Sequence, residues 1–242
     1  MSELLAMPED WTKALAIVAH PDDMEYGAAA AVAGWTRAGR EVAYLMVTRG
    51  EAGIDTMTPE ECVPVRDAEQ RASAAVVGVS SVEFLDHPDG VIEAGVELRR
   101  DLAAAIRRHR PELVITLNRR EYFVPGHWNS ADHRAVGESV LDAVYDAGNR
   151  WIFPEQLQDG LEPWGGVRWV ALAASPESTH AVDVSDTMEA GVASLLEHRA
   201  YISALTDEDP ETYVRGFLTS FATGVGERFG TKYATTFELI SY

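Results

Sequence analysis

Three side chains that can bind or activate a ligand stand together at one short turn of the sequence. His20, Asp22 and Asp23 follow the apolar run "ALAIVA" (14–19) and precede an alanine-rich stretch. An imidazole and a carboxylate three residues apart can share one divalent cation, and hydrolytic zinc sites commonly use three His or Asp/Glu ligands. His133, in "NSADHRAVG", is the candidate third ligand. We therefore predict one Zn²⁺ per chain, or another divalent metal, held by His20, Asp23 and His133.

Asp22 has two possible roles at this turn. Zinc bound by such ligands lowers the pKa of a water molecule to about 7, and Asp22 could take a proton from that water and return it to a leaving amine. Alternatively, Asp22 and Glu25 have the spacing of a capping box at a helix N-terminus, where acidic residues are favourable. Spacing leaves both roles open, and His133 by itself also fits an ordinary histidine at the start of a helix.

The elements that position these residues alternate along the chain. The predicted strands are 14–19, 41–48, 81–85, 112–117 and 167–174. The predicted helices are 25–38, 66–77, 96–109 and 132–147, followed by helices at 187–205 and 210–222 and a closing strand at 237–240. Alternating strands and helices are typical of an α/β domain with a largely parallel sheet. We predict a Rossmann-like α/β fold, its sheet flanked by helices, as a single domain over residues 1–242.

Two connections, Arg49–Val65 and Asn118–Ala131, are longer than the usual strand-to-helix loops of about 2–6 residues. Both follow the carboxyl ends of predicted strands, as "HPDD" does. Ligands of open α/β sheets bind at that edge. The candidate residues are therefore expected to meet there.

Composition excludes several partners. The 242 residues carry a formal net charge of −19, which opposes general binding to nucleic acid or to an anionic membrane surface. The sequence lacks a run of the ~20 apolar residues that a membrane span requires, and its start has no basic, apolar signal segment. Cys62 is the single cysteine, which suits a reducing compartment. We expect a cytoplasmic protein without membrane insertion, acting on a small molecule, and a homo-oligomer is compatible with the sequence.

Six segments, in this order, resemble the PIG-L/LmbE-like superfamily of zinc-dependent N-deacetylases, which includes GlcNAc-PI de-N-acetylase-like proteins. They are "AHPDDMEYGAA", "VTRGEAG", "RDAEQRASAAVVGV", "FLDHPDG", "DHRAVG" and "LLEHRAY". The resemblance covers most of the chain and favours metal ligation over capping alone at the first segment.

The resemblance implies roles for individual residues. His20, Asp23 and His133 would be the zinc ligands, and Asp22 the general base and later the acid. It also implies that two further residues contact sugar hydroxyls. These are Arg66, for which a helix-surface ion pair is the alternative, and Asp89, for which a turn before Gly90 is the alternative.

One position departs from the family pattern. A histidine that helps to stabilise the oxyanion usually stands three residues before the third ligand, and here that position is Ser130. Losing such a donor costs ~10²–10³-fold in rate in other hydrolases. The Ser130 hydroxyl, His127 or the zinc itself could replace it. His127 is our preferred candidate, although a solvent-exposed loop histidine is an equal alternative, and Asp132 is then left to cap its helix.

The expected function is that of a zinc-dependent hydrolase acting on a linear amide C–N bond. It would remove an acyl group, most simply acetyl, from the amino nitrogen of an N-acetylglucosamine-type substrate. Alternatives are an amidase for a mycothiol-like thiol conjugate or a natural-product amide, and a sugar-binding module with impaired catalysis. His198 is expected to line the floor of the site or to pack in the core. Aromatic side chains that could stack on a sugar are Tyr26, Tyr122, Phe123 and Trp128.

Overall fold

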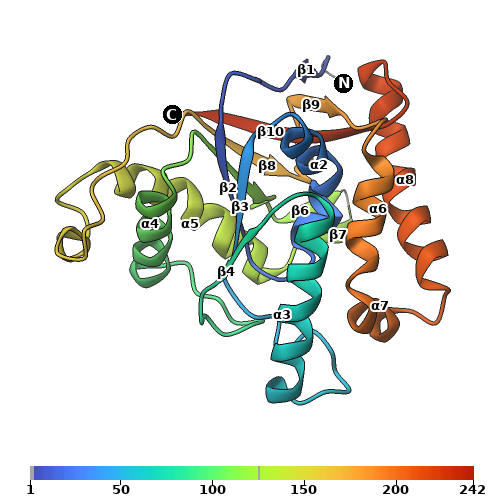
Figure 1. Ribbon diagram of the computed structural model, residues 1–242, viewed down its shortest axis with the longest axis horizontal. Helices are drawn as coiled ribbons and strands as arrows, with labels where there is room; N and C mark the ends of the chain where they lie inside the picture. Colours follow the sequence, from blue (N-terminus) through green and yellow to red (C-terminus); the bar gives the residue numbers. More distant parts are fainter. Residues whose placement is uncertain (1–2, 125) are drawn as a thin grey trace.

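The chain folds around one mixed β-sheet, as a computed structural model that describes residues 3–124 and 126–242 shows (Figure 1). The strand order is β1-β9-β10-β8-β5-β2-β3-β4. Neighbouring strands run parallel from β8 to β4, while β10 is antiparallel to both β8 and β9. The strands are β1 (Leu5–Ala6), β2 (Lys13–Val18), β3 (Glu41–Met46), β4 (Ser81–Phe84), β5 (Leu113–Leu117), β8 (Trp169–Ala173), β9 (His180–Asp183) and β10 (Ala234–Ser241). The predicted α/β fold with a largely parallel sheet is confirmed.

Helices cover both faces of this sheet (Figure 1). They are α1 (Asp23–Gly27), α2 (Ala29–Arg37), α3 (Pro59–Val76), α4 (Val96–His109), α5 (Ala131–Gly148), α6 (Met188–Leu196), α7 (Arg199–Leu205) and α8 (Pro210–Phe229), with a 3₁₀ turn at Pro154–Leu157. Among the described residues, no helix is both long and apolar enough to cross a membrane.

The side-chain alternation of the strands divides the core into two layers. In β2, Ala16 and Val18 pack in a cluster with residues of α2, α6 and α8, whereas Leu15 and Ile17 pack with α4 and α5. Successive strand residues point to opposite faces, so a central strand covered on both sides must be apolar at nearly every position. This explains the continuous apolar runs that marked the strands in the sequence.

Two predicted helices are interrupted in the structure. The helix predicted at 25–38 is split at Ala28, whose backbone leaves the helical region at φ −155°. The helix predicted at 187–205 is split at His198 (φ −79°, ψ 51°), between α6 and α7. The break at His198 places its fully buried side chain next to the turn that carries the candidate ligands.

Helix α3 begins seven residues before the predicted start at Arg66. Thr58 and Glu61 form a capping box, in which each side chain accepts a hydrogen bond from the other residue's backbone N–H, and Pro59 occupies the first helical position. Both are recognised helix-start signals. The second proline, Pro64, lies inside the helix and does not mark a boundary.

The long connection after β5 has structure of its own. β6 (Tyr122–Val124) and β7 (His127–Trp128) form an antiparallel hairpin that leads into α5. The connection after β5 and the turn after β2 both follow the carboxyl ends of parallel strands, as predicted. The turn carries His20 and Asp23, and the first turn of α5, directly after the hairpin, carries His133.

Candidate functional site

The turn after β2 holds its polar residues in an unusual backbone conformation. Asp22 has φ 82° and ψ −18°, in the left-handed region that non-glycine residues seldom adopt. The Asp23 carboxylate accepts a hydrogen bond from the backbone N–H of His20 at 2.8 Å, which closes the turn. Such strained conformations are concentrated at functional sites. The Asp22 carboxylate does not cap α1, so the capping-box alternative is wrong for the residues described.

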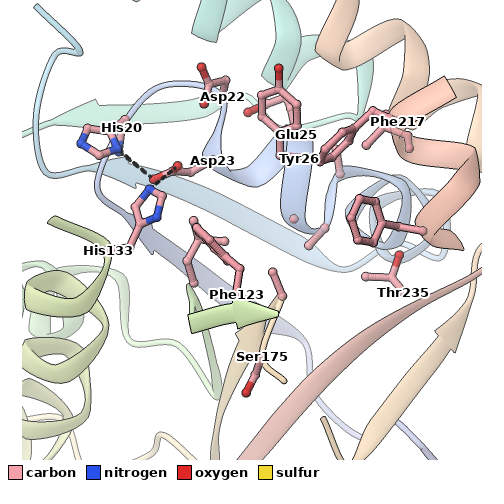
Figure 2. Close-up of a pocket in the computed structure, with 18 of the residues that line it drawn as sticks. His20, Asp22, Asp23, Glu25, Tyr26, Phe123, His133, Ser175, Phe217 and Thr235 are labelled. Carbon is pink, nitrogen blue, oxygen red and sulfur yellow. Dashed lines mark hydrogen bonds and ion pairs between the residues drawn. The ribbon is translucent and has the colours of Figure 1, made fainter. Parts of the chain in front are cut away.

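His20, Asp23 and His133 meet, although 110 residues separate the last two. One potential ligand atom from each lies within 4.8 Å of the other two. Nε2 of His133 is 3.0 Å from one oxygen of Asp23, and Nδ1 of His20 is 3.6 Å from the other oxygen (Figure 2). The Asp23 carboxylate is 6% exposed at its side chain, so the shared point is shielded from bulk water.

Asn129 fixes the orientation of His133. Its side-chain amide nitrogen donates to the carbonyls of Asn118 and Arg120, at 2.7 and 2.9 Å, so its oxygen faces Nδ1 of His133 at 3.0 Å. An amide oxygen can only accept, and Nδ1 therefore carries the proton. The lone pair of His133 Nε2 is left facing the Asp23 carboxylate, an arrangement that a cation between them stabilises.

Two carboxylates orient His20 in the same way. Its Nε2 is 3.1 Å from both Asp89 and Asp132. Asp132 is buried and also accepts hydrogen bonds from the backbone N–H groups of Gly90 and Ile92, at 2.7 and 3.1 Å. Metal-binding histidines typically donate their second N–H to such a carboxylate, which leaves Nδ1 of His20 free to bind a metal.

The charge balance of the cluster favours a bound cation. Burial opposes the charged form of Asp23, but His133 and His20 outweigh it and lower the pKa of Asp23, so the carboxylate stays ionised. Burial likewise acts to lower the pKa of His20, yet its hydrogen bonds with Asp132 and Asp23 raise that pKa well above the ordinary value. The surrounding carboxylates thus attract a positive charge at His20, either a proton or a metal ion in its place. With that proton displaced, two imidazole nitrogens and one carboxylate fit a divalent metal such as zinc.

Asp22 lies beside this cluster in a different environment. Burial raises its pKa, against the attraction of Arg66 and His198, and the neighbouring Asp23 charge raises it further. One oxygen accepts a 2.7 Å hydrogen bond from Arg66 Nη2, which also donates to the carbonyl of Pro21. A carboxylate with a raised pKa is suited to accept a proton and to release it again at neutral pH.

The cluster opens into a cavity of about 990 Å³. His20, Asp22, Asp23 and His133 line one end, and the cavity continues past Tyr26 towards α8 and β10 (Figure 2). Typical small-molecule sites have ~300–1,000 Å³, so the cavity is large enough to hold a substrate beyond its reacting group.

Comparison with known proteins identifies the family. The family model of PIG-L, described as GlcNAc-PI de-N-acetylase, matches residues 15–144, which include all three candidate ligands. The chain belongs to the PIG-L family.

Three of the proteins similar to this PIG-L chain are deacetylases by name. Diacetylchitobiose deacetylase from Thermococcus kodakarensis is 28% identical over 226 residues, which make up 91% of this chain and 81% of that protein. A probable N-acetyl-alpha-D-glucosaminyl L-malate deacetylase 2 from Bacillus anthracis is 28% identical over 54% of this chain and 58% of its own length. The solved N,N'-diacetylchitobiose deacetylase from Pyrococcus horikoshii, complexed with its inhibitor MPG, superposes with a TM-score of 0.86 at 26% identity, covering 96% of this chain and 85% of that one.

The two residues predicted to contact sugar have protein partners in this PIG-L structure. Arg66 is 1% exposed, binds Asp22 and lies 4.1 Å from the ring centre of Tyr201. It also pairs with Glu69 at 3.7 Å, so the ion pair of the alternative is present but buried and not on the helix surface. Asp89 binds His20 and accepts a hydrogen bond from the backbone N–H of Ala52 at 2.9 Å. Both still line the cavity, and their contact with a sugar stays a prediction.

Both candidates for the oxyanion donor also line the cavity. Ser130 is the N-cap of α5, and its hydroxyl oxygen accepts a hydrogen bond from the backbone N–H of His133 at 3.0 Å, which leaves its own proton available. His127 is exposed on β7. Asp132 does not cap the helix, contrary to prediction, because its carboxylate is engaged by His20 and the backbone near Gly90.

Sequence reasoning missed two residues that support the site. Asn129 orients His133 from four positions earlier, and Gln70 accepts a 2.9 Å hydrogen bond from the backbone N–H of Asp22. Gln70 lies four residues after Arg66, so both project from one face of α3, and that spacing was the available signal. Asn129 gave no such signal, because it precedes its helix within an irregular connection.

Proposed function

We propose that this chain is a zinc-dependent hydrolase that removes an acyl group, most simply acetyl, from the amino nitrogen of an N-acetylglucosamine-type substrate. The observation that carries the proposal is the meeting of His20, Asp23 and His133 at one point of a large cavity, with the carboxylate of Asp22 beside them. The names of the deacetylase relatives support the substrate class. A reducing, cytoplasmic location is part of the proposal and rests on the single, buried Cys62.

A divalent metal held by His20, Asp23 and His133 would act as a Lewis acid on the acyl carbonyl and would lower the pKa of an attacking water molecule. His20 and His133 hold their lone pairs towards the metal position because Asp132 and Asn129 engage their other nitrogens. Asp22 takes a proton from the water whose oxygen bonds to the acyl carbon. The C–N bond then breaks, and Asp22 returns that proton to the amine nitrogen as a carboxylate and free amine leave.

The role of Asp22 is tested by Asp22→Asn. Asparagine tolerates the left-handed backbone of this position and keeps the side-chain shape, but it cannot accept the proton. We expect bound zinc to be retained and acetate release from N-acetylglucosamine or diacetylchitobiose to fall about 10²–10⁴-fold. Metal content by mass spectrometry and an acetate assay measure both.

Asp86→Asn is the matched control, because Asp86 is an exposed carboxylate paired with Arg49. It should leave turnover unchanged. Turnover of Asp22→Asn at the wild-type rate would remove Asp22 from the mechanism. Sugar binding without turnover in the wild-type protein would favour the alternative of a binding module, which the serine at position 130 keeps open.

A further inference from the structure

The cavity has two chemically different parts. The end described above is polar and holds the metal-binding cluster. The other part, which we call the apolar arm, extends between α2, α6, α8 and β10, and Figure 2 shows its entrance at Tyr26 and Phe217. The apolar arm is lined chiefly by Ala28, Ala30, Met188, Phe217, Phe221 and Val225.

Helix α8 forms one wall of the apolar arm. Val214, Leu218 and Ala222 recur every four residues and are buried, and the last two also reach the cavity. A second stripe with the same spacing, Phe217, Phe221 and Val225, lines the cavity as well, and Val225 also packs against a small core cluster. Residues four apart share a helix face, so the apolar side of α8 extends from the core into the cavity wall, where the two phenylalanines are exposed.

An aromatic row connects this wall to the reaction centre. Tyr26, three residues after the candidate ligand Asp23, meets Phe217 edge-on with ring centres 5.2 Å apart, and Phe217 contacts Phe221 at 4.9 Å. Phe217 is 37% exposed and Phe221 57% exposed. Large apolar side chains exposed as a group mark a binding surface, and this group is continuous with the polar end of the cavity.

Small side chains form another part of the lining. Ala28 and Ala30, at the start of α2, line the cavity and leave open the space that larger side chains would fill. Thr235 and Thr236 of β10 and Arg228 of α8 add polar groups to this lining. An amino sugar needs hydrogen-bond partners for its hydroxyl groups, whereas the aromatic stripe of α8 and the alanines of α2 offer only apolar surface.

We propose that the apolar arm binds an alkyl or aryl group that the substrate carries next to the scissile amide. The inference rests on the proposed function and narrows it from an amino sugar to an amino sugar with an apolar substituent. That substituent sits either on the acyl carbon or on the anomeric oxygen. α6, α8 and β10 lie outside residues 15–144 and α2 lies inside them, so most of the elements around the arm belong to the part of the chain beyond the family match.

Binding is tested first, without any chemical step. Hexyl and methyl β-D-glucosaminides carry no amide and differ in about five methylene groups, each worth about fourfold in affinity when fully buried. We expect the hexyl compound to bind the zinc-loaded protein at least about tenfold more tightly by calorimetry. Equal affinities would exclude the anomeric side, and the inference is overturned if N-hexanoylglucosamine then shows no advantage in kcat/KM either.

Turnover then locates the substituent. The substrates are methyl N-acetyl-β-D-glucosaminide, hexyl N-acetyl-β-D-glucosaminide and N-hexanoylglucosamine. A higher kcat/KM for the hexyl glycoside assigns the arm to the anomeric side, and a higher kcat/KM for the hexanoyl amide assigns it to the acyl side. Alkyl-dependent binding without any turnover supports the arm and contradicts the proposed function. Turnover of all three substrates with equal kcat/KM overturns the inference and leaves the proposed function intact.

Phe221→Ala tests the wall itself. Because Phe221 is largely exposed, the variant should fold, and we expect the hexyl-to-methyl affinity ratio to fall at least threefold, with Phe221→Leu restoring part of it. Tyr145→Ala is the matched control, an aromatic on a helix surface that is 72% exposed and outside the cavity, and its ratio should equal that of the wild type. If sedimentation shows a dimer that excludes the hexyl ligand, the stripe belongs to a second copy and the inference is overturned.

Discussion

The two aspartates of "HPDD" lie in different environments, and these environments suit them to different chemical roles. Asp23 faces two imidazoles that keep its carboxylate ionised. Burial raises the pKa of Asp22, although the neighbouring Arg66 opposes that rise. Two adjacent, chemically identical side chains therefore fit different roles, a ligand and a base. Environment and not residue type assigns them.

Asn129 should control metal affinity without touching the metal. Asn129→Ala removes the oxygen that holds His133 in the tautomer needed for binding. Loss of such a partner typically costs about 10–100-fold in metal affinity, and competition with a chromophoric chelator measures it. Asn118→Ala is the control, since Asn118 braces the same connection through Tyr122 and Arg120 without contacting His133. Equal losses of metal affinity in both variants would show that Asn129 acts by holding the connection before α5 in place and not by orienting His133.

Sequence reasoning named the candidate ligands but not the residues that orient them. His20 and Asp23 are close in sequence, and His133 was proposed as the third ligand from its place after the second long connection, with the family resemblance in agreement. The contact of His20 with Asp132 spans 112 residues, and the hydrogen bonds of Asp132 to Gly90 and Ile92 span 42 and 40 residues. Such pairings depend on the folded arrangement of β2, α5 and the connection after β4, which spacing along the chain does not encode.

At the scale of elements, Glu238 joins three segments beside the cavity. From β10 it accepts two hydrogen bonds from Arg120, at 2.6 and 3.1 Å, and one from Ser175 after β8, at 2.6 Å. Burial favours the neutral form of Glu238, but these partners outweigh it and lower its pKa. The charged form is therefore the one that stabilises the fold.

Glu238→Gln should reduce stability in a pH-dependent way. A folded pKa below the unfolded value of about 4.3 gives stabilisation that is present above pH 4.3 and is lost as the pH falls through the folded value. We expect the free energy of unfolding to drop by about 1–3 kcal/mol at pH 7, with the difference shrinking on acidification in urea titrations. Glu177→Gln, which removes an exposed partner of the same Arg120, should cost less than about 0.5 kcal/mol. A loss independent of pH would contradict this role.

Element boundaries show which local signals were readable. α4 was predicted at its observed bounds, Val96–His109, because its apolar periodicity is uninterrupted. The start of α3 was predicted seven residues too late, although the capping box of Thr58 and Glu61 and the proline at position 59 are local signals for it. β1 and β9 have two and four residues, and they become strands by pairing with each other and with β10. Strands this short contain too few residues to show the alternation of apolar and polar side chains by which strands are predicted.

Thr58→Ala tests the missed signal. The variant removes the side-chain half of the capping box, a 3.4 Å hydrogen bond from the backbone N–H of Glu61 to Oγ1 of Thr58, and leaves that N–H only the carbonyl of residue 58 as an acceptor at 3.0 Å. The free energy of unfolding should fall by about 0.5–2 kcal/mol, measured by urea titration. Thr56→Ala, an exposed threonine two residues earlier, should be within about 0.5 kcal/mol of the wild type. Equal effects of the two substitutions would mean that the cap does not stabilise α3.

At the scale of the whole molecule, the three candidate metal ligands come from both layers of the core. His20 and Asp23 follow β2 at the start of α1, which packs on the layer with α2 and α6, whereas His133 comes from α5 in the opposite layer. A metal bound by all three therefore ties both layers together at the carboxyl edge of the sheet. Its binding energy becomes part of the stability of the folded state.

Removal of zinc with a chelator should consequently lower the melting temperature. At a free zinc concentration of about 1,000 times Kd, binding stabilises the fold by about 4 kcal/mol, which corresponds to about 10 °C for a chain of this length. Differential scanning calorimetry with and without zinc measures the shift. His133→Ala should abolish it because a ligand is lost, whereas Asp22→Asn should preserve it. The same melting temperature with and without zinc would show that these three side chains do not share an ion, and the proposed hydrolysis would lose its basis.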